Sequence, residues 1–263
     1  MLADRRILVT GVLTPESIAF AVAAAAQRAG ASVLLTAEPR RLRVVQRTAR
    51  ALPQPAEVLA LDVTAAADVA AAAEAIEHRW RRLDGLVHSV AHAPPEALGG
   101  GFMACPPAAV ATTLATGALS LHALCEGFTP LLARAPRGAS VVAFDFGPGS
   151  AWPGYDWQGV AKATLGAIGR YLALYLGAAR VRVNLVAAGP LATPAGRAVG
   201  DCDAAGAAWA RRAPLGWDPH DAQPVADATA FLLSDLARGI TGEILHVDGG
   251  AHAIGDALEA APA

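Results

Sequence analysis

The sequence predicts an α/β protein built on one doubly wound parallel sheet, with helices on both faces. The chain has 263 residues, which suits one large domain. Short apolar runs alternate with longer helical stretches, and the runs lack the period-2 alternation of a half-exposed strand. Strands buried on both faces and joined by crossover helices form a parallel, Rossmann-like sheet.

The expected elements follow one another without a linker or an internal repeat, so we expect one domain over residues 1–253. The tail, 254–263, has no evident partner, and we expect it to be mobile. The expected strands are 7–10, 32–36, 57–61, 85–89, 140–144, 181–186 and 243–248. The expected helices are 17–29, 40–52, 65–82, 106–133, 155–177 and 224–235.

Composition excludes several classes of protein. Hydrophobic residues make up 54% and charged residues 17% of the chain, against a usual charged share of about 25%, so disorder is excluded as the main state of the chain. The net charge of -2 argues against a nucleic-acid partner. No uninterrupted apolar run approaches the ~18–20 residues of a membrane span. The cysteines Cys105, Cys125 and Cys202 form neither a metal pattern nor a disulfide framework, so we expect a cytoplasmic protein without a metal.

The turn after the first strand holds one glycine, Gly11, where the dinucleotide fingerprint G-x-G-x-x-G has three. Gly11 still permits close backbone approach, and Ser17 is placed to cap the following helix. The start of that helix can bind a pyrophosphate through its free N–H groups and its dipole. A helix cap without any ligand would leave the same pattern.

The ends of the next strands indicate which dinucleotide binds. Glu38 suits an unphosphorylated ribose, whereas Arg40 and Arg41 leave the phosphorylated cofactor open. The two arginines also fit an exposed helix face. Asp62 follows the third strand and can hydrogen-bond the adenine edge, and the small residues of 88–91 would let the backbone lie against a cofactor. The sequence therefore favours NADH over NADPH.

Tyr155 and Lys162 follow the fifth strand and lie seven residues apart, nearly two helical turns. A tyrosine hydroxyl can donate to an oxygen that gains negative charge, and a nearby lysine can hold a ribose and add a positive field. A surface tyrosine and a surface lysine would show the same spacing. Lys162 is, however, the single lysine of the chain, and it follows a strand at the edge where such sheets bind ligands.

Together these segments resemble the NADH-dependent enoyl-acyl-carrier-protein reductases of the short-chain dehydrogenase/reductase superfamily, above all the mycobacterial type. The Tyr-x6-Lys spacing is specific, since ordinary members of the superfamily have Tyr-x3-Lys. The matching segments are GVLTPESIAF (11–20), LDV (61–63), DGLVHSVA (84–91), DFGPGSAWPGYDWQGVAK (145–162), VRVNLVAAGPLATPAG (181–196), RAPLGW (212–217) and TGEILHVDGGAH (241–252).

The resemblance implies a role for each matching residue. Tyr155 would bind the substrate by a hydrogen bond to its thioester carbonyl, Lys162 would hold the nicotinamide ribose, and Phe146 would lie beside the nicotinamide. A substrate loop would occupy residues 193–217. The residues implied in cofactor binding are Gly11, Ser17, Ile18, Asp62, Val63, Ser89, Val90, Ala91, Lys162, Pro190, Leu191 and Thr193.

The resemblance also implies the reaction, which is reduction of the trans-2 double bond of an enoyl thioester in fatty acid synthesis. Hydride would add at C3, and the Tyr155 hydroxyl would stabilise the negative charge on the thioester oxygen. The substrate would be carried by acyl carrier protein or by coenzyme A. The resemblance further implies a homotetramer.

Three departures from the family pattern stand out. Ala91 replaces a usual glycine and His92 replaces a usual phenylalanine. The segment 193–217 is shorter than in the mycobacterial type, which accepts very long acyl chains. We therefore expect the substrate preference to level off at medium chain length.

Three other functions stay open or are disfavoured by the residues. A ketone reductase of the same superfamily would need Tyr-x3-Lys and a serine about a dozen residues before the tyrosine, and Ser150 lies too close to Tyr155. A reductase of enoyl-CoA or of a specialised metabolite stays open. A non-catalytic dinucleotide-binding protein would have no need for both Tyr155 and Lys162.

Overall fold

The computed structural model describes residues 1–147, 149–200 and 202–255, and its centre is a seven-stranded parallel sheet. The tail expected to be mobile lies outside the described residues from position 256 onward. The strand order is β3-β2-β1-β4-β5-β6-β7, which confirms the predicted doubly wound sheet. The strands are β1 (Arg6–Val9), β2 (Ser32–Ala37), β3 (Val58–Ala60), β4 (Gly85–His88), β5 (Ala139–Asp145), β6 (Val181–Ala188) and β7 (Ile244–Val247).

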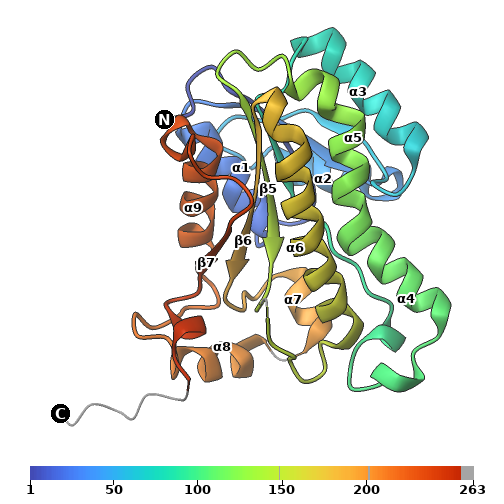
Figure 1. The fold of residues 1–263 in the computed structure, drawn as a ribbon, viewed down its shortest axis with the longest axis vertical. Coiled ribbons are helices and arrows are strands. Elements are labelled where there is room, and N and C mark those ends of the chain that lie inside the picture. The colour runs from blue at the N-terminus through green and yellow to red at the C-terminus, as the bar shows by residue number, and fades with distance from the viewer. Residues whose placement is uncertain (148, 201, 256–263) are drawn as a thin grey trace.

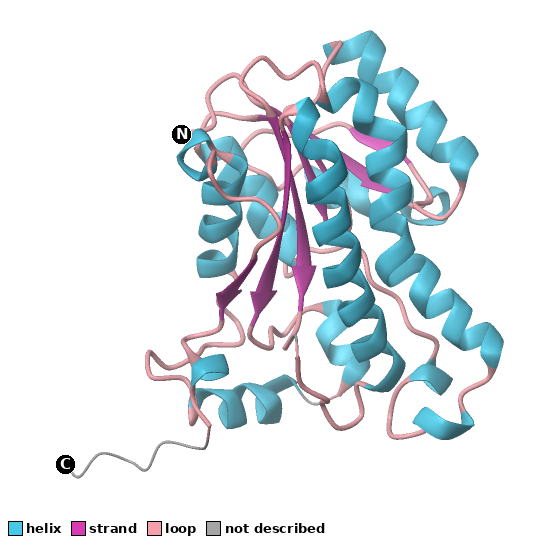
Figure 2. Cartoon of the chain, viewed as in Figure 1, coloured by secondary structure: helices cyan, strands magenta, loops and turns pink. Residues whose placement is uncertain are grey.

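Helices cover both faces of the sheet (Figures 1 and 2). One face packs on α1 (Ile18–Arg28), α2 (Leu42–Ala49) and α9 (Gln223–Leu233). The other face packs on α3 (Ala66–Trp80), α5 (Ser120–Leu132) and α6 (Asp156–Leu176), and α4 (Pro107–Leu114) continues α5 away from the sheet.

The strands read as unbroken apolar runs because successive side chains enter two different cores. In β1, Ile7 and Val9 belong to the core under α1 and α9, whereas Leu8 belongs to the core under α5 and α6. In β2, Val33 and Leu34 divide in the same way. Side chains on both faces of these two strands are thus buried, as expected for a parallel sheet between two helical layers.

The structure divides one helix that the sequence predicts as continuous, and it places helices within the expected substrate segment. The helix expected over 106–133 contains a π-helical turn, Ala115–Leu119, between α4 and α5. The substrate loop expected over 193–217 contains two helices, α7 (Pro194–Val199) and α8 (Cys202–Ala210). Pro194 stands at the first turn of α7, and the Thr193 hydroxyl accepts a hydrogen bond from the Gly196 N–H at 3.0 Å. These two residues supply the start signal of α7.

Among the described residues, one helical segment, Pro107–Leu132, has the length and hydropathy that a membrane span needs. Its Leu121, Leu124 and Phe128 are fully buried in the core under α5 and α6. Apolar composition here serves packing between the sheet and the helical layer, as in the core helix of a globular protein.

Candidate active site

The loops after β1 and β4 meet at the point where the strand order reverses, which is where sheets of this kind bind ligands. Gly11 adopts φ +82°, and a Cβ built on it would lie 1.8 Å from the carbonyl oxygen of Ser89. Thr10 joins the same loops, since its hydroxyl donates to the Val87 carbonyl at 3.0 Å and accepts from the Ser89 N–H at 3.1 Å. The single glycine of this turn is therefore required by contact between two loops of the site.

The segment after Ser89 leads out of the sheet toward the surface. Val90 is half-buried, and its side chain packs against the core under α5 and α6. Ala91 and His92 are exposed. These two of the three departures from the family pattern thus lie on the open side of the site, where a methyl group or an imidazole meets solvent or a bound molecule.

The hydroxyl of Ser17 does not cap α1, so this expectation is wrong. It accepts hydrogen bonds from the Leu13 N–H at 3.2 Å and the Thr14 N–H at 3.0 Å, and α1 has no side-chain cap. Ser17 therefore shapes the loop between Gly11 and the helix. The N–H groups at the start of α1, including that of Ile18, are not occupied by a capping side chain and stay suited to an anion.

The carboxylates after β2 and β3 are both engaged by neighbours. Glu38 lies 2.5 Å from Arg40 Nε and 3.9 Å from Arg41 Nε, so the arginines balance its charge. Asp62 accepts hydrogen bonds from the Thr64 hydroxyl at 2.7 Å and the Thr64 N–H at 2.9 Å. These bonds hold the pKa of Asp62 below its usual value. Its carboxylate is thus charged and fixed in direction, and the next residue, Val63, is buried.

Tyr155 precedes α6 and Lys162 lies within it, both beside the carboxyl end of β5. Lys162 is 8% exposed, and its Nζ donates to the Phe144 carbonyl at 2.5 Å. Burial lowers the pKa of Lys162, and the nearby Asp145 opposes that shift. Burial and then Asp145 raise the pKa of Tyr155, against a hydrogen bond from Gln158. Tyr155 is thus a neutral hydrogen-bond donor at ordinary pH.

Sequence reasoning missed two buried polar residues beside this pair. Asp145 ends β5, and its Oδ1 accepts the Phe146 N–H at 2.7 Å, while its Oδ2 has no hydrogen-bond partner among the described residues. Gln158 is 4% exposed, and its Oε1 also lacks a partner there. Burial raises the pKa of Asp145. Gln158 was detectable, because it follows Tyr155 by three residues on one helix face.

Phe146 packs directly against Tyr155. Their ring centroids are 5.2 Å apart, and the rings meet edge to face. Trp152 and Trp209 contact the same Phe146 ring at 5.4 and 5.6 Å. Trp209 comes from α8, so the segment 193–217 reaches the tyrosine through Phe146.

Proteins of one family are similar to this chain along nearly its whole length. A family model described as enoyl-(acyl carrier protein) reductase matches residues 11–252. The chain is 38% identical to the enoyl-acyl-carrier-protein reductase (NADH) of Mycolicibacterium smegmatis, over 95% of this chain and 97% of the relative. It is 37% identical to that of Mycobacterium avium over the same shares, and 35% identical to that of Neisseria meningitidis over 95% of each chain.

The chain belongs to the enoyl-acyl-carrier-protein reductase family. The resemblance found in the sequence, including the mycobacterial one, is thereby confirmed. In this reductase the remaining predicted residues follow β6. The Pro190 carbonyl accepts the indole N–H of Trp217 at 2.7 Å, and Leu191 and Thr193 are buried where α7 begins. Gly189 packs so closely that a Cβ there would lie 2.6 Å from the Trp217 ring.

The reductase also buries a histidine, His88, under the site. The sequence analysis assigns no chemistry to this residue. His88 ends β4 and is 1% exposed, and its Nε2 lies 2.8 Å from the Ser120 hydroxyl oxygen. The Ser120 hydroxyl donates to the Thr116 carbonyl at 2.6 Å, so the imidazole donates to Ser120. Burial, and then the charge of Lys162, lowers the pKa of His88 to about 3. His88 is therefore neutral and adds no positive charge beside Lys162.

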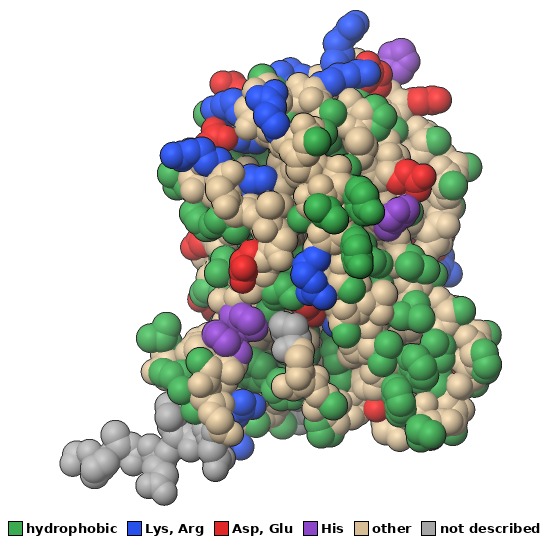
Figure 3. Space-filling view, viewed as in Figure 1, with side chains coloured by type: hydrophobic (Ala, Val, Ile, Leu, Met, Phe, Trp, Pro, Cys, Tyr) green, Lys and Arg blue, Asp and Glu red, His purple; other side chains and the backbone are tan. Residues whose placement is uncertain are grey.

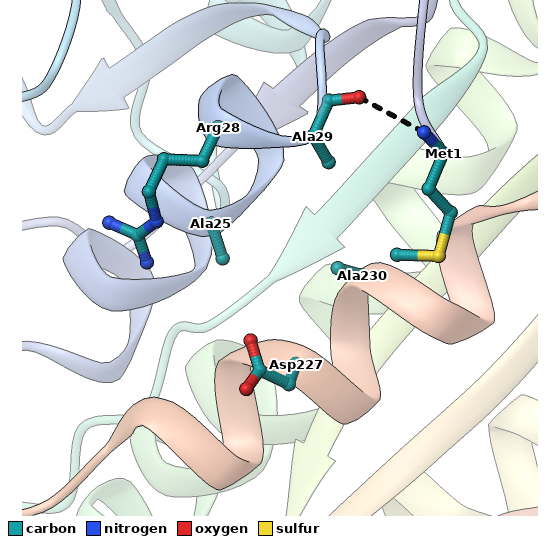
Figure 4. Close-up of a pocket in the computed structure, with 6 residues that line it drawn as sticks. All are labelled: Met1, Ala25, Arg28, Ala29, Asp227 and Ala230. Atoms are coloured by element: carbon teal, nitrogen blue, oxygen red, sulfur yellow. Dashed lines mark hydrogen bonds between the residues drawn. The ribbon is translucent and has the colours of Figure 1, made fainter.

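One pocket of about 310 Å³ lies elsewhere in the reductase, between α1 and α9 (Figure 4). Its lining includes Met1, Arg28 and Asp227, and the N-terminal amino group donates to the Ala29 carbonyl at 3.3 Å. None of the predicted site residues lines it. This pocket is separate from the candidate active site.

Proposed function

We propose that this chain reduces the trans-2 double bond of enoyl thioesters carried by acyl carrier protein, with NADH as reductant, in fatty acid synthesis. The observation that carries the proposal is the arrangement of Tyr155, Lys162 and Asp145 at the carboxyl end of β5, beside the β1–β4 switch point. The relatives that carry the name enoyl-acyl-carrier-protein reductase (NADH) support the cofactor and the reaction.

The residues present fit a nicotinamide dinucleotide. The start of α1 is without a side-chain cap and suits a pyrophosphate near Ser17 and Ile18. Two buried acceptor atoms, Oδ2 of Asp145 and Oε1 of Gln158, are without partners among the described residues, as expected where a ligand completes the hydrogen bonding. The residues proposed to line the cofactor are those after β1, β3, β4 and β6, namely Gly11, Ser17, Ile18, Asp62, Val63, Ser89, Val90, Ala91, Pro190, Leu191 and Thr193.

Lys162 has the donors to hold the cofactor ribose. An ammonium group has three N–H donors, and the Phe144 carbonyl takes one of them. Among the described residues no other acceptor takes the remaining two donors, which can therefore bind the ribose hydroxyls. The carboxylate of Asp145 supports the charged form of Lys162 against the effect of burial. Lys162 thus supplies a positive charge close to Tyr155.

Tyr155 acts on the substrate. NADH, when bound, supplies the hydride that adds to C3 of the enoyl group. As negative charge grows on the thioester oxygen, the Tyr155 hydroxyl donates a hydrogen bond to it, and the Lys162 charge lowers its energy further. A proton from solvent then completes C2. The raised pKa of Tyr155 keeps the hydroxyl protonated for this task.

Turnover of trans-2-octenoyl thioesters, followed by NADH absorbance, tests this function. Steady oxidation of NADH by wild type, with loss in Tyr155→Phe, is expected. Comparing the acyl-carrier-protein thioester with the coenzyme A thioester separates the two carriers, and we expect a higher kcat/KM for the former. Binding of NADH without oxidation would favour a non-catalytic dinucleotide-binding protein.

We further propose that residues 1–253 form one domain and that the chain works in the cytoplasm as a homotetramer. The surface of α6 supports the assembly, because Tyr171, Leu174 and Tyr175 are 65%, 69% and 75% exposed. Tyr171 and Tyr175 line a groove between α5 and α6 together with His122 and Ile168. Figure 3 shows hydrophobic side chains on this face. A second copy of α5 and α6 would bury these side chains.

A further inference from the structure

The residues on either side of Tyr155 are both held by one exposed, glycine-rich segment. The Gly99 N–H donates to the Gly154 carbonyl at 2.9 Å, and the Gly100 N–H donates to Asp156 Oδ2 at 2.6 Å. Two successive N–H groups thus bond to the residue before Tyr155 and to the residue after it. The backbone that carries the tyrosine is therefore fixed from outside its own helix.

A further hydrogen bond and a ring stack join the same segment, residues 99–102, to α6. The Trp157 Nε1–H donates to the Phe102 carbonyl at 3.0 Å. The two rings stack with centroids 4.8 Å apart and an angle of 19° between their planes. All four residues of this segment, which we call the glycine segment, are exposed. Because the glycine segment has no core of its own, these contacts determine its place beside Tyr155.

Asp156 adopts a backbone conformation that few side chains accept. Its φ is +41°, in the left-handed region. Aspartate and asparagine enter this region more readily than most residues, because their short polar side chains can hydrogen-bond nearby. Such conformations persist where the surroundings hold them, and they cluster at functional sites. The bond from Gly100 supplies such a hold at the point where the chain turns from Tyr155 into α6.

Loss of this hold would displace Tyr155 more than Lys162. Tyr155 precedes the first residue of α6, so its position depends on the turn at Asp156. Lys162 lies in the second turn of α6, and its Nζ donates to the Phe144 carbonyl in β5. The lysine proposed to hold the cofactor thus has an anchor of its own. A change at Asp156 should act on the reaction rather than on NADH binding.

We propose that Asp156 is a positioning residue of this reductase: through its bond to the glycine segment, it holds the Tyr155 hydroxyl where it can donate to the thioester oxygen. The inference rests on the proposed function, since Asp156 acts through Tyr155. It goes further by giving a part in the reaction to an aspartate and an exposed segment that the proposed function leaves without a role.

The test measures kcat with trans-2-octenoyl coenzyme A and the Kd for NADH in wild type, Asp156→Asn and Asp156→Gly. Both replacements tolerate a positive φ, but only the asparagine keeps a side-chain oxygen that can accept the Gly100 N–H. In Asp156→Gly we expect kcat to fall about tenfold with an unchanged Kd for NADH, because a misplaced hydroxyl slows the reaction without touching the cofactor. Asp156→Asn should keep kcat near that of wild type.

Two controls separate positioning of Tyr155 from damage to the fold. Asp4→Gly makes the same replacement at a φ of +63°, in the loop before β1, and should leave kcat unchanged. In a Tyr155→Phe background, Asp156→Gly should cause no further loss of kcat, because the hydroxyl that it positions is already absent. Thermal melts followed by circular dichroism show that each variant is folded, and Asp156→Ala replaces Asp156→Gly if the latter is not.

An unchanged kcat in folded Asp156→Gly would overturn the inference, and so would equal losses of kcat in Asp156→Gly and Asp156→Asn. A further loss in the Tyr155→Phe background would show that Asp156 does not act through Tyr155 and would overturn it as well. Each of these results leaves the proposed function intact, because wild type still oxidises NADH. Absence of turnover in wild type would overturn the proposed function, and the inference with it.

Discussion

Tyr155 and Lys162 lie close together but have different partners in the proposed reaction. Tyr155→Phe removes the donor to the thioester oxygen, so we expect kcat to fall by about a hundredfold with little change in NADH affinity. Lys162→Ala removes the proposed ribose contact, so NADH affinity itself should weaken. Stopped-flow turnover and fluorescence titration with NADH measure the two effects. Equal loss of NADH affinity in both variants would contradict this division of roles.

Gly11 joins the loops after β1 and β4 by backbone contact. Gly11→Ala would place a methyl group 1.8 Å from the Ser89 carbonyl oxygen at a φ of +82°. We expect a loss of stability of about 1–3 kcal/mol or more, measured by urea unfolding, with weaker NADH binding. The matched control is Gly99→Ala, because Gly99 has φ +78° and no neighbour within 4 Å of such a methyl group. Equal losses in the two variants would show that φ alone matters.

His88 makes stability depend on pH. Its pKa of about 3 in the folded state lies below the usual value of 6.5, so the unfolded chain binds a proton first as pH falls. Stability should therefore decline from about pH 6.5 toward pH 3, by about 2 kcal/mol at about pH 5. Urea unfolding across this range measures it. The glutamine in His88→Gln can still donate to Ser120, and the stability of this variant should decline less steeply as pH falls. Identical stability profiles in the variant and in wild type would refute the assignment of the pH dependence to His88.

At the scale of elements, the short turn after β2, Pro39–Arg41, bears on the choice of cofactor. Glu38 precedes this turn and pairs with Arg40 and Arg41. A cofactor 2′-phosphate would meet the Glu38 carboxylate, which is costly, whereas a ribose hydroxyl can donate to it. Glu38→Arg removes the negative charge, frees both arginines and should shift the kcat/KM ratio toward NADPH. Glu38→Gln is the control for charge alone, and an unchanged ratio in both variants would place cofactor choice elsewhere.

The sequence predicts the elements well where burial leaves a local pattern. Leu8 and Leu34 sit within unbroken apolar runs because both faces of their strands are covered. The π-helical turn between α4 and α5 leaves no such pattern. It brings Gly117 against α6, where a Cβ would lie 3.4 Å from the Ala161 methyl group. A close approach between helices depends on tertiary packing that neither segment encodes alone.

The candidate site likewise contains residues that the sequence alone reveals and residues that only the structure reveals. Tyr155 and Lys162 could be found because their spacing and order along the chain are specific. The contact between Trp152 and Trp209 could not, because these residues are 57 positions apart in sequence and meet only in the folded chain. Asp145 was hidden for another reason, because a carboxylate at a strand end is common. Its importance lies in its burial and in an oxygen, Oδ2, that has no hydrogen-bond partner among the described residues.

At the scale of the whole molecule, the exposed apolar face of α6 predicts assembly. Leu174→Glu would place a charge among Tyr171, Tyr175 and their copies, so sedimentation should show smaller species at micromolar concentration. Leu236→Glu is the matched control, because Leu236 is 66% exposed outside α5 and α6. A monomeric wild type would contradict the proposed tetramer, and an intact tetramer in Leu174→Glu would place its interface elsewhere.

Lys162 is the single lysine of the chain, and it is buried in the second turn of α6. A protease specific for lysine therefore has one bond to cut, between Lys162 and Ala163. That bond becomes accessible only when α6 leaves the sheet. The rate of this one cleavage would report how often the site opens, and NADH should slow it. Amine-reactive labels would likewise find two targets, the N-terminal amine and Lys162, which we propose holds the ribose.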